Sequence, residues 1–413
     1  MKKIKVYIFN SLCRGSLYGI GTYIRELQST LDKAGIDYGI VNLYGIGNTV
    51  TTSEDAGHIS INIPRVQYLN NNGSKYYTRN VAYLLREIIQ VESDVKLIFH
   101  LNFMSEPDLV DALKKSFPKS KVVLFAHYTN WSFDLMGDEC QLQKILKRPA
   151  KSRKGREQAI HDAFKADLKM IRKVDHFVCV AQHTLRTYQK YGTVNLDKCT
   201  VINNALTDNY HFIEDKEKNT IRNKYYIRSD EQVLLFAGRL DSIKGVEPLI
   251  QAFMILKENH PRLRLYLLGE GDYNHWLNTA ENNWSQITFT GKLSKEKVQD
   301  FYNIADVGVV CSLHEEFGLT AIEMMMNQLP IVVSDAGGLD EIVENEISGL
   351  KVHVETKDKQ RTINPQELAD KISCLLDDQL LSLRIAKGAR KRFLEKYEIV
   401  NYSTQMAELY QTI

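Results

Sequence analysis

At about 150 residues per domain, a chain of 413 residues is expected to form two to three domains, so a single small domain is excluded. Hydrophobic residues make up 44% of the chain and charged residues 25%, values typical of a globular protein and not of a disordered or fibrous one. The 53 lysines and arginines barely exceed the 51 aspartates and glutamates, which argues against a nucleic-acid partner held by a broad basic face.

The cysteines and the apolar runs indicate the cellular compartment in which the protein is expected. Six cysteines, among them Cys13, are scattered without a C-x-x-C pair, so neither a zinc site nor a disulfide framework is indicated. No apolar run approaches the roughly 20 residues of a membrane-spanning helix. The apolar run after the basic start ends at Phe9, too short for a secretory signal. We therefore expect a cytoplasmic protein.

Short β-branched runs alternate with longer segments of helical spacing, a pattern typical of doubly wound α/β domains with buried parallel sheets. The expected strands are 4–9, 36–43, 97–100, 122–126 and 177–181 in the first half, and 233–237, 263–268, 287–290, 307–311 and 331–334 in the second. Polar residues dominate 203–223, which we interpret as the connection. The sequence thus predicts two Rossmann-like domains, 1–205 and 206–394. An apolar stripe in 393–413, made of Tyr397, Val400, Tyr402, Met406, Leu409 and Tyr410, should dock on the rest of the chain.

Two features of the first half could contact a ligand. Gly19 and Gly21 precede a helical pattern, where glycine permits close approach of the backbone. A dinucleotide fingerprint would need a third glycine where the chain has Ile24, so an NAD site is not supported. His127 follows strand 122–126, where it could touch a ligand, although a lone histidine is more often structural. Both interpretations of His127 stay open.

A basic segment lies between residues 144 and 156. It contains seven lysines and arginines: Lys144, Lys147, Arg148, Lys151, Arg153, Lys154 and Arg156. A mobile, solvated loop is one interpretation, and an anion-binding or membrane-surface patch is the other.

The second half holds two strand-turn-helix segments with charged residues at the turn. In 236–246, Arg239 offers a bidentate fork and Lys244 a point charge, which together suit a diphosphate leaving group without a metal. No D-x-D motif occurs, which also favours metal-free chemistry. In 311–323, Gly318 leads into a helix whose first N–H groups suit a phosphate. Glu315 and Glu323 could accept hydrogen bonds from sugar and ribose hydroxyls, or could simply be acidic residues of an ordinary helix.

These segments, in this order and at these distances, resemble the retaining GT-B glycosyltransferases, in particular the family 4-like (group 1) nucleotide-sugar enzymes. The resemblance covers nearly the whole chain and implies two Rossmann-like domains facing across a cleft. It also implies that the C-terminal helix, about 395–413, crosses back to the N-terminal domain. Residues 9–11 and 18–24 resemble the corresponding segments of a Bacteroidetes subgroup of this family. That resemblance implies a bacterial protein.

The resemblance assigns roles residue by residue. Arg239 and Lys244 would stabilise the donor diphosphate. Glu323 would hold the ribose, and Glu315 and His127 would contact the donor sugar. The remaining donor-binding positions are Gly19, Gly21, Gly238, Gly269, Gly291, Lys292, Leu293, Phe317, Gly318 and Leu319. The chain departs from the family at Asn204-Ala205, where the family often has Asn-Gly, and at 337–341, where it often has Gly-Gly-x-Pro-Glu.

The implied function is that of a retaining, metal-independent glycosyltransferase of the hexosyltransferase type, without a cofactor. It would use a nucleotide-diphosphate sugar, with UDP assumed from its frequency in the family, and a glycan, lipid or peptide acceptor. A nucleotide-sugar epimerase on the same fold and a catalytically silent sugar-nucleotide-binding module are the alternatives. The sequence specifies neither the sugar nor the acceptor, and it leaves open a covalent adduct or a same-face route.

Overall fold

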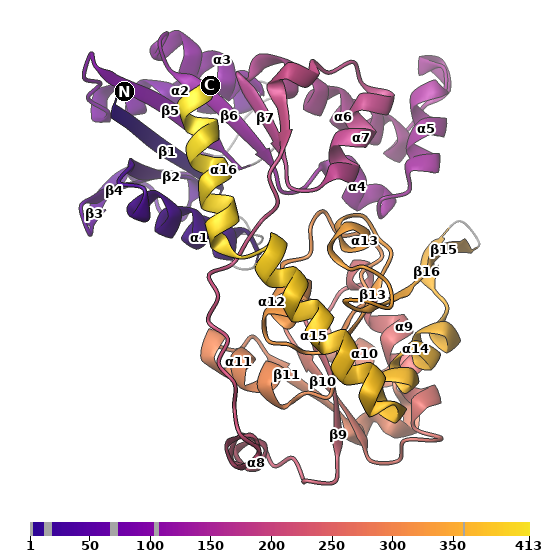
Figure 1. Cartoon of the computed structure of the whole chain (residues 1–413). Helices are drawn as coiled ribbons and strands as arrows, with labels where there is room; N and C mark the ends of the chain where they lie inside the picture. Colours follow the sequence, from indigo (N-terminus) through magenta and orange to yellow (C-terminus); the bar gives the residue numbers. More distant parts are fainter. Residues whose placement is uncertain (1–2, 12–18, 67–72, 103–106, 358–359) are drawn as a thin grey trace. The chain divides into compact units, whose positions relative to one another are not determined.

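The computed structural model describes residues 3–11, 19–66, 73–102, 107–357 and 360–413, so that Cys13 and Tyr18 lie outside the described residues. The chain forms two compact units (Figure 1). The first contains residues 1–205 and 399–413, and the second contains residues 206–398.

The first unit is built on an eight-stranded sheet in the order β3-β4-β2-β1-β5-β6-β7-β8, in which only the β3–β4 pair is antiparallel. Its strands are β1 (Lys3–Ser11), β2 (Asp37–Gly45), β3 (Thr51–Asp55), β4 (His58–Pro64), β5 (Val95–Leu101), β6 (Lys121–Ala126), β7 (His176–Cys179) and β8 (Cys199–Val201). Its helices are α1 (Gly19–Lys33), α2 (Gly73–Ile88), α3 (Pro107–Ser116), α4 (Asn130–Leu135), α5 (Glu139–Lys147), α6 (Arg156–Lys173), α7 (Gln182–Tyr191) and α16 (Ile399–Thr412).

Helices cover both faces of this sheet. Successive side chains of a strand point to opposite faces, so one strand contributes residues to both cores. In β1, Tyr7 and Phe9 belong to the core formed with α2 to α7, whereas Val6 and Ile8 belong to the core formed with α1 and α16. Inner strands such as β6 are therefore buried nearly throughout, which explains their continuous apolar sequence.

The C-terminal helix α16 completes the second of these cores (Figure 1). Its buried residues are Ile399, Tyr402, Met406, Leu409 and Tyr410. The predicted apolar stripe is wrong at one position, because Val400 is 64% exposed. Tyr397 precedes the helix and is buried as expected, but it packs on Phe317 in the second unit. The expectation that this helix packs on the N-terminal domain is confirmed.

The second unit has a six-stranded, fully parallel sheet in the order β11-β10-β9-β12-β13-β14. Its strands are β9 (Gln232–Ala237), β10 (Leu263–Leu268), β11 (Ile287–Gly291), β12 (Val307–Val310), β13 (Ile331–Ser334) and β14 (Leu350–Val352), with a separate antiparallel pair β15 (Val354–Lys357) and β16 (Gln360–Ile363). Its helices are α8 (Asp215–Lys224), α9 (Val246–Leu256), α10 (Tyr273–Thr279), α11 (Lys295–Ile304), α12 (Leu319–Met326), α13 (Gly338–Ile342), α14 (Pro365–Asp377) and α15 (Gln379–Lys396).

All ten strands expected from the sequence are present, with ends that differ by at most two residues. The two Rossmann-like sheets are thereby confirmed. The polar stretch 203–223 is more ordered than expected, because α8 begins within it. Among the described ranges, every helix is too short or too polar to cross a lipid bilayer.

Candidate functional site

The carboxyl ends of β9, β10 and β11 are held together by glycine backbone. The N–H of Gly238 donates to the Leu268 carbonyl at 2.8 Å, and the N–H of Gly269 donates to the Gly291 carbonyl at 3.1 Å. A Cβ atom on Gly269 would lie 1.7 Å from the Gly238 carbonyl oxygen, so a side chain cannot fit there. These glycines bring three loops together at the edge where parallel sheets bind ligands.

The turn after β9 carries two positively charged side chains, Arg239 and Lys244. The carboxylate of Asp241 accepts the Lys244 N–H at 3.2 Å, and its other oxygen pairs with the Arg239 guanidinium at 3.2 Å. Gly245 ends the turn in the left-handed conformation (φ +69°), where a Cβ atom would lie 2.0 Å from the Cys311 carbonyl oxygen. Asp241 thus fixes the geometry of both Arg239 and Lys244.

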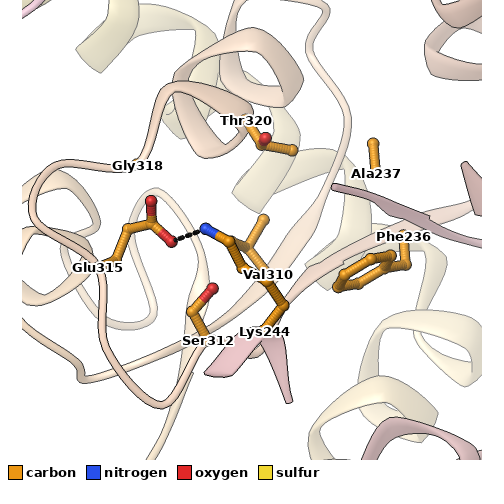
Figure 2. A pocket seen from close by; sticks show the side chains of 8 residues that line it. All are labelled: Phe236, Ala237, Lys244, Val310, Ser312, Glu315, Gly318 and Thr320. Carbon is orange, nitrogen blue, oxygen red and sulfur yellow. Dashed lines mark hydrogen bonds and ion pairs between the residues drawn. The ribbon is translucent and has the colours of Figure 1, made fainter. Parts of the chain in front are cut away.

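Lys244 points into a hollow of about 240 Å³, part of which is open to solvent (Figure 2). The hollow is lined by Phe236, Ala237, Lys244, Val310, Ser312, Glu315, Gly318 and Thr320. Within it, Lys244 Nζ lies 2.5 Å from Glu315 Oε2. Two residues that were separated by 71 positions in the sequence are therefore paired at one site.

The surroundings of Glu315 favour its charged form. Burial by itself raises the pKa of Glu315, but the Lys244 charge and hydrogen bonds from Lys244 and Ser312 outweigh it and hold this pKa below its usual value. The contribution of Glu315 to stability is therefore present at neutral pH and is lost as the pH falls through its lowered pKa.

Backbone groups close one side of the hollow. Gly318 adopts φ +124° and precedes α12, whose first N–H groups are available to a ligand as at any helix start. The preceding loop is fixed because the Gly338 N–H donates to the Glu315 carbonyl at 2.8 Å. A Cβ atom on Gly338 would lie 2.4 Å from the Phe317 carbonyl oxygen, so the closeness of these loops requires glycine there.

Glu323 lies further along α12 and is oriented by a tyrosine. The Tyr302 hydroxyl on α11 donates to Glu323 Oε2 at 2.7 Å. Burial together with the Glu323 carboxylate raises the pKa of Tyr302 well above its usual value, so this hydroxyl stays protonated. Sequence reasoning missed Tyr302, for which no local signal existed, and also missed Ser312 and Thr320 within a segment it had singled out.

The predicted donor-binding residues of the second unit do not all face the hollow. Phe317 is buried, and its ring packs edge-on against Tyr397 with centroids 5.9 Å apart, so its side chain belongs to the core. Lys292 is exposed and Leu293 is half-buried, directly after Gly291 at the end of β11. The structure brings together Lys244, Glu315 and Gly318 around the hollow, with Leu319 next in the chain.

The first unit carries the other predicted site residues. Gly19 and Gly21 lie in the first turn of α1. His127 follows β6 and is half-buried, with its ring centroid 4.0 Å from that of Tyr23 and 6.0 Å from that of Phe125. His127 thus stands at the carboxyl end of a strand, as expected.

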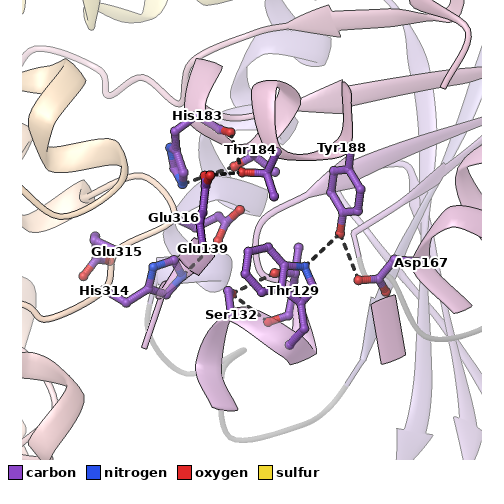
Figure 3. A network of polar contacts seen from close by, with 12 residues as sticks. Thr129, Ser132, Glu139, Asp167, His183, Thr184, Tyr188, His314, Glu315 and Glu316 are labelled. Atoms are coloured by element: carbon purple, nitrogen blue, oxygen red, sulfur yellow. Dashed lines mark hydrogen bonds and ion pairs between the residues drawn. The ribbon is translucent and has the colours of Figure 1, made fainter. Parts of the chain in front are cut away.

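The segment after His127 is anchored by hydrogen bonds (Figure 3). The Thr129 hydroxyl donates to the Ser132 hydroxyl at 2.7 Å, and the Ser132 hydroxyl lies 2.9 Å from the Thr129 carbonyl. Further along, the Trp131 indole N–H donates to the Tyr188 hydroxyl at 3.4 Å, and that hydroxyl donates to Asp167 at 2.9 Å. The last two bonds join α4, which follows β6, to α6 and α7.

The basic segment 144–156 is a loop only in its middle. Residues 148–155 connect α5 to α6 and contain a 3₁₀ turn over Ala150–Ser152, whereas Lys144 and Lys147 lie in α5 and Arg156 begins α6. Its arginines contact the protein: Arg148 pairs with Glu157 at 2.6 Å, Arg153 donates to the Arg148 carbonyl at 2.9 Å, and Arg156 donates to the Asp134 carbonyl. The lysines of the segment, Lys144, Lys147, Lys151 and Lys154, are all exposed.

Potential metal ligands do not cluster within the described ranges. Within them, no three His, Cys, Asp or Glu side chains gather closely enough to hold a metal ion. Cys179 and Cys311 are buried, and Cys140 and Cys374 are exposed, all as free thiols.

Two family models match this chain. "Glycosyltransferase Family 4" matches residues 18–209, and "Glycosyl transferases group 1" matches residues 217–392. The boundary between the two matches falls where the first unit gives way to the second.

Curated relatives match part of the chain. An uncharacterized glycosyltransferase of Methanocaldococcus jannaschii is 31% identical over 221 residues, which cover 52% of this chain and 54% of that protein. The alpha-D-kanosaminyltransferase of Streptomyces kanamyceticus is 27% identical over 196 residues, covering 47% and 48%. The chain thus spans about half the length of the curated relatives it matches.

Solved structures match the chain over nearly its whole length. A sucrose-phosphate synthase from Thermosynechococcus elongatus has a TM-score of 0.75 at 18% identity, covering 98% of both chains. HepE of Anabaena, solved in complex with UDP and glucose, has a TM-score of 0.73 at 16% identity, covering 100% of both. At these identities the similarity shows the fold, which is GT-B.

Proposed function

This chain belongs to the family 4-like, group 1 glycosyltransferases, and from that premise we propose that it transfers a sugar from a nucleotide-diphosphate donor to an acceptor hydroxyl with retention of configuration. The observation that carries the proposal is the Lys244–Glu315 pair in the hollow, beside the start of α12. A cation and helix N–H groups suit the diphosphate, and a carboxylate suits the hydroxyls of the sugar.

In the proposed reaction, the bond between the anomeric carbon and the donor diphosphate breaks as a bond to the acceptor oxygen forms. The departing diphosphate takes the acceptor's proton, so no protein base is needed. Lys244 and Arg239 stabilise the charge that develops on the leaving group, which is the kind of interaction that lowers a barrier most. Helix N–H groups at Gly318 and Leu319 add to this stabilisation.

The two carboxylates serve binding. Glu323, oriented by Tyr302, accepts hydrogen bonds from the ribose hydroxyls. Glu315 accepts hydrogen bonds from the donor sugar, and His127 is a proposed sugar contact. We propose a hexose as the transferred group and a glycan, lipid or peptide as the acceptor.

UDP-glucose is the first donor to test. HepE, which shares the fold, was solved with UDP and with UDP-glucose, which supports a uridine nucleotide for this chain. A ligand that binds only the native state raises apparent stability by RT ln(1 + [L]/Kd). A thermal-shift screen of UDP-, GDP- and ADP-sugars should therefore show stabilisation by one nucleotide class, and a screen with no stabilising nucleotide would contradict the proposal.

We expect activity to be independent of divalent metal ions. Lys244 and Arg239 already supply positive charge for the diphosphate, so a bridging cation is not required. The measurement is sugar transfer after exhaustive treatment with EDTA. Loss of transfer that is restored by Mg²⁺ or Mn²⁺ would contradict the metal-free mechanism.

We further propose a cytoplasmic location with peripheral contact to the membrane through 144–156. The four exposed lysines of this segment carry the proposal. Replacing Lys144, Lys147, Lys151 and Lys154 by glutamine should lower binding to anionic vesicles by roughly 10²- to 10³-fold, at about 1 kcal/mol per lysine near a charged surface. Donor affinity should stay unchanged, and the effect should shrink as salt rises.

The matched control removes the same charge elsewhere. Lys295, Lys297, Lys387 and Lys391 are also exposed, on α11 and α15. Glutamine at these four positions should leave vesicle co-sedimentation near the wild-type level. Equal losses in both variants would show an effect of net charge alone and would contradict a specific contact at 144–156.

A further inference from the structure

A chain of buried polar side chains joins the C-terminal helix to the middle of the first sheet. The Tyr410 hydroxyl on α16 lies 2.6 Å from Nδ1 of His100. Nε2 of His100 lies 3.0 Å from the Tyr23 hydroxyl and 3.0 Å from Oδ1 of Asn102. The amide nitrogen of Asn102 in turn donates to the Phe9 carbonyl at 3.1 Å. None of the four side chains is more than 2% exposed.

These contacts fix the proton positions on His100. Because the Asn102 amide nitrogen must face a carbonyl, its oxygen faces His100 and can only accept. Nε2 of His100 therefore carries the hydrogen, and Nδ1 accepts from the Tyr410 hydroxyl. Burial lowers the pKa of His100 to about 3, with a further contribution from His127, so the ring is neutral at physiological pH.

This series of hydrogen-bonded side chains ends against His127. The ring of Tyr23 lies 4.0 Å from that of His127, tilted by 55°. Phe125 forms a second wall, because His100 stacks on it at 4.3 Å and His127 lies 6.0 Å from it at a similar angle. The rings that border His127 are thus the ones that contact His100.

We propose that Tyr410, His100 and Tyr23 are positioning residues for His127, so that the C-terminal helix sets the orientation of a sugar-contacting side chain. This inference rests on the role of His127 in the proposed function. Asn102 fixes the tautomer of His100, and the Tyr410 hydroxyl that donates to Nδ1 fixes the orientation of its ring between Phe125 and Tyr23. Without that donor, Nδ1 is a buried acceptor with no hydrogen bond from Tyr410, and the ring can tilt and displace Tyr23.

The test begins with Tyr410→Phe, which removes one oxygen and keeps the ring. We expect kcat to fall about tenfold with donor affinity unchanged, since misplacement of a contacting group lowers the rate more than binding. The matched control is Tyr77→Phe on α2, a buried tyrosine of the same unit whose hydroxyl accepts from the Tyr44 N–H at 2.9 Å. This control should lose stability to a similar degree and keep its kcat. An equal loss of kcat in both variants would overturn the inference.

A double-mutant cycle separates positioning from a general structural effect. If Tyr410 acts through His127, adding Tyr410→Phe to His127→Ala should lower kcat no further. Additive losses would overturn this inference while leaving the proposed function intact. A His127→Ala enzyme with wild-type kcat would instead contradict the role of His127 in the proposed function, and this inference with it.

The tautomer itself is measurable without turnover. In long-range ¹H–¹⁵N spectra of the histidine-labelled protein, His100 should show a protonated Nε2 and an unprotonated Nδ1 that do not titrate near neutral pH. Tyr410→Phe should shift the Nδ1 resonance, because Nδ1 loses its hydrogen-bond donor, while Nε2 keeps its hydrogen; Tyr77→Phe should change neither. A protonated Nδ1 in the wild-type protein would overturn the inference.

Discussion

Replacing Lys244 by alanine should lower kcat by about 10²- to 10³-fold, the usual loss when one stabiliser of developing charge is removed. The physical reason is that Lys244 lies in the hollow beside Glu315, where its charge is less screened than at the surface. Arg239→Ala should behave similarly, and Arg239→Lys should rescue only in part because the planar fork is lost. Steady-state kinetics with the donor identified by thermal shift provide the measurement.

A matched lysine controls for the loss of an ion pair. Lys351 pairs with Asp340 at 2.7 Å in the same unit and is 20% exposed, compared with 22% for Lys244. Lys351→Ala should therefore leave kcat unchanged. A Lys244→Ala enzyme with normal turnover, or an equal loss in the two variants, would contradict the assignment of Lys244 to the leaving group.

Gly245→Ala should destabilise the second unit by about 3 kcal/mol or more, through left-handed backbone strain and a clash in the core. The added Cβ atom would meet the Cys311 carbonyl oxygen at 2.0 Å, and backbone cannot move aside as a flexible side chain can. For a unit of this size, that loss corresponds to a decrease in Tm of roughly 6–12 °C. Calorimetry measures it directly.

Gly291 provides the comparison, because it shares the backbone conformation without the clash. Its φ is +71° against +69° for Gly245, and its nearest contact to an added Cβ atom is the Tyr273 hydroxyl at 3.4 Å. Gly291→Ala should therefore cost only the strain of the left-handed conformation, about 1–2 kcal/mol. Equal destabilisation by the two substitutions would show that contact with Cys311 does not matter.

Much of the fold could be predicted because the inner strands are buried on both faces and read as apolar runs. The strands that were missed lack that signature. β3 is the polar segment Thr51–Asp55, exposed at all five residues, and β8 and β14 are only three residues long. β4 did carry a signal, the alternation of Ile59, Ile61 and Ile63, which was overlooked.

The residues of the candidate site could be predicted where charged residues and glycines occur together in a strand-turn-helix segment. Arg239, Lys244 and Glu315 stand out because they are charged residues in the segments that lead from a buried strand to the next helix. Two features could not be read from the sequence. Phe317 adjoins the site in the chain, but its ring packs on Tyr397, a contact across 80 positions. Tyr302 orients Glu323 from another helix, and only the packing of α11 reveals it.

The order of synthesis matters for a chain whose last helix belongs to its first unit. When residues 1–205 have left the ribosome, Val6, Ile8 and Val123 still lack the cover that α16 provides. Domains generally fold in order of emergence, with the N-terminal one first. Here the second unit can complete its core while the face of the first unit that α16 shares with α1 is only partly covered. A premature stop ahead of α16 would consequently damage the part of the protein that was made earliest.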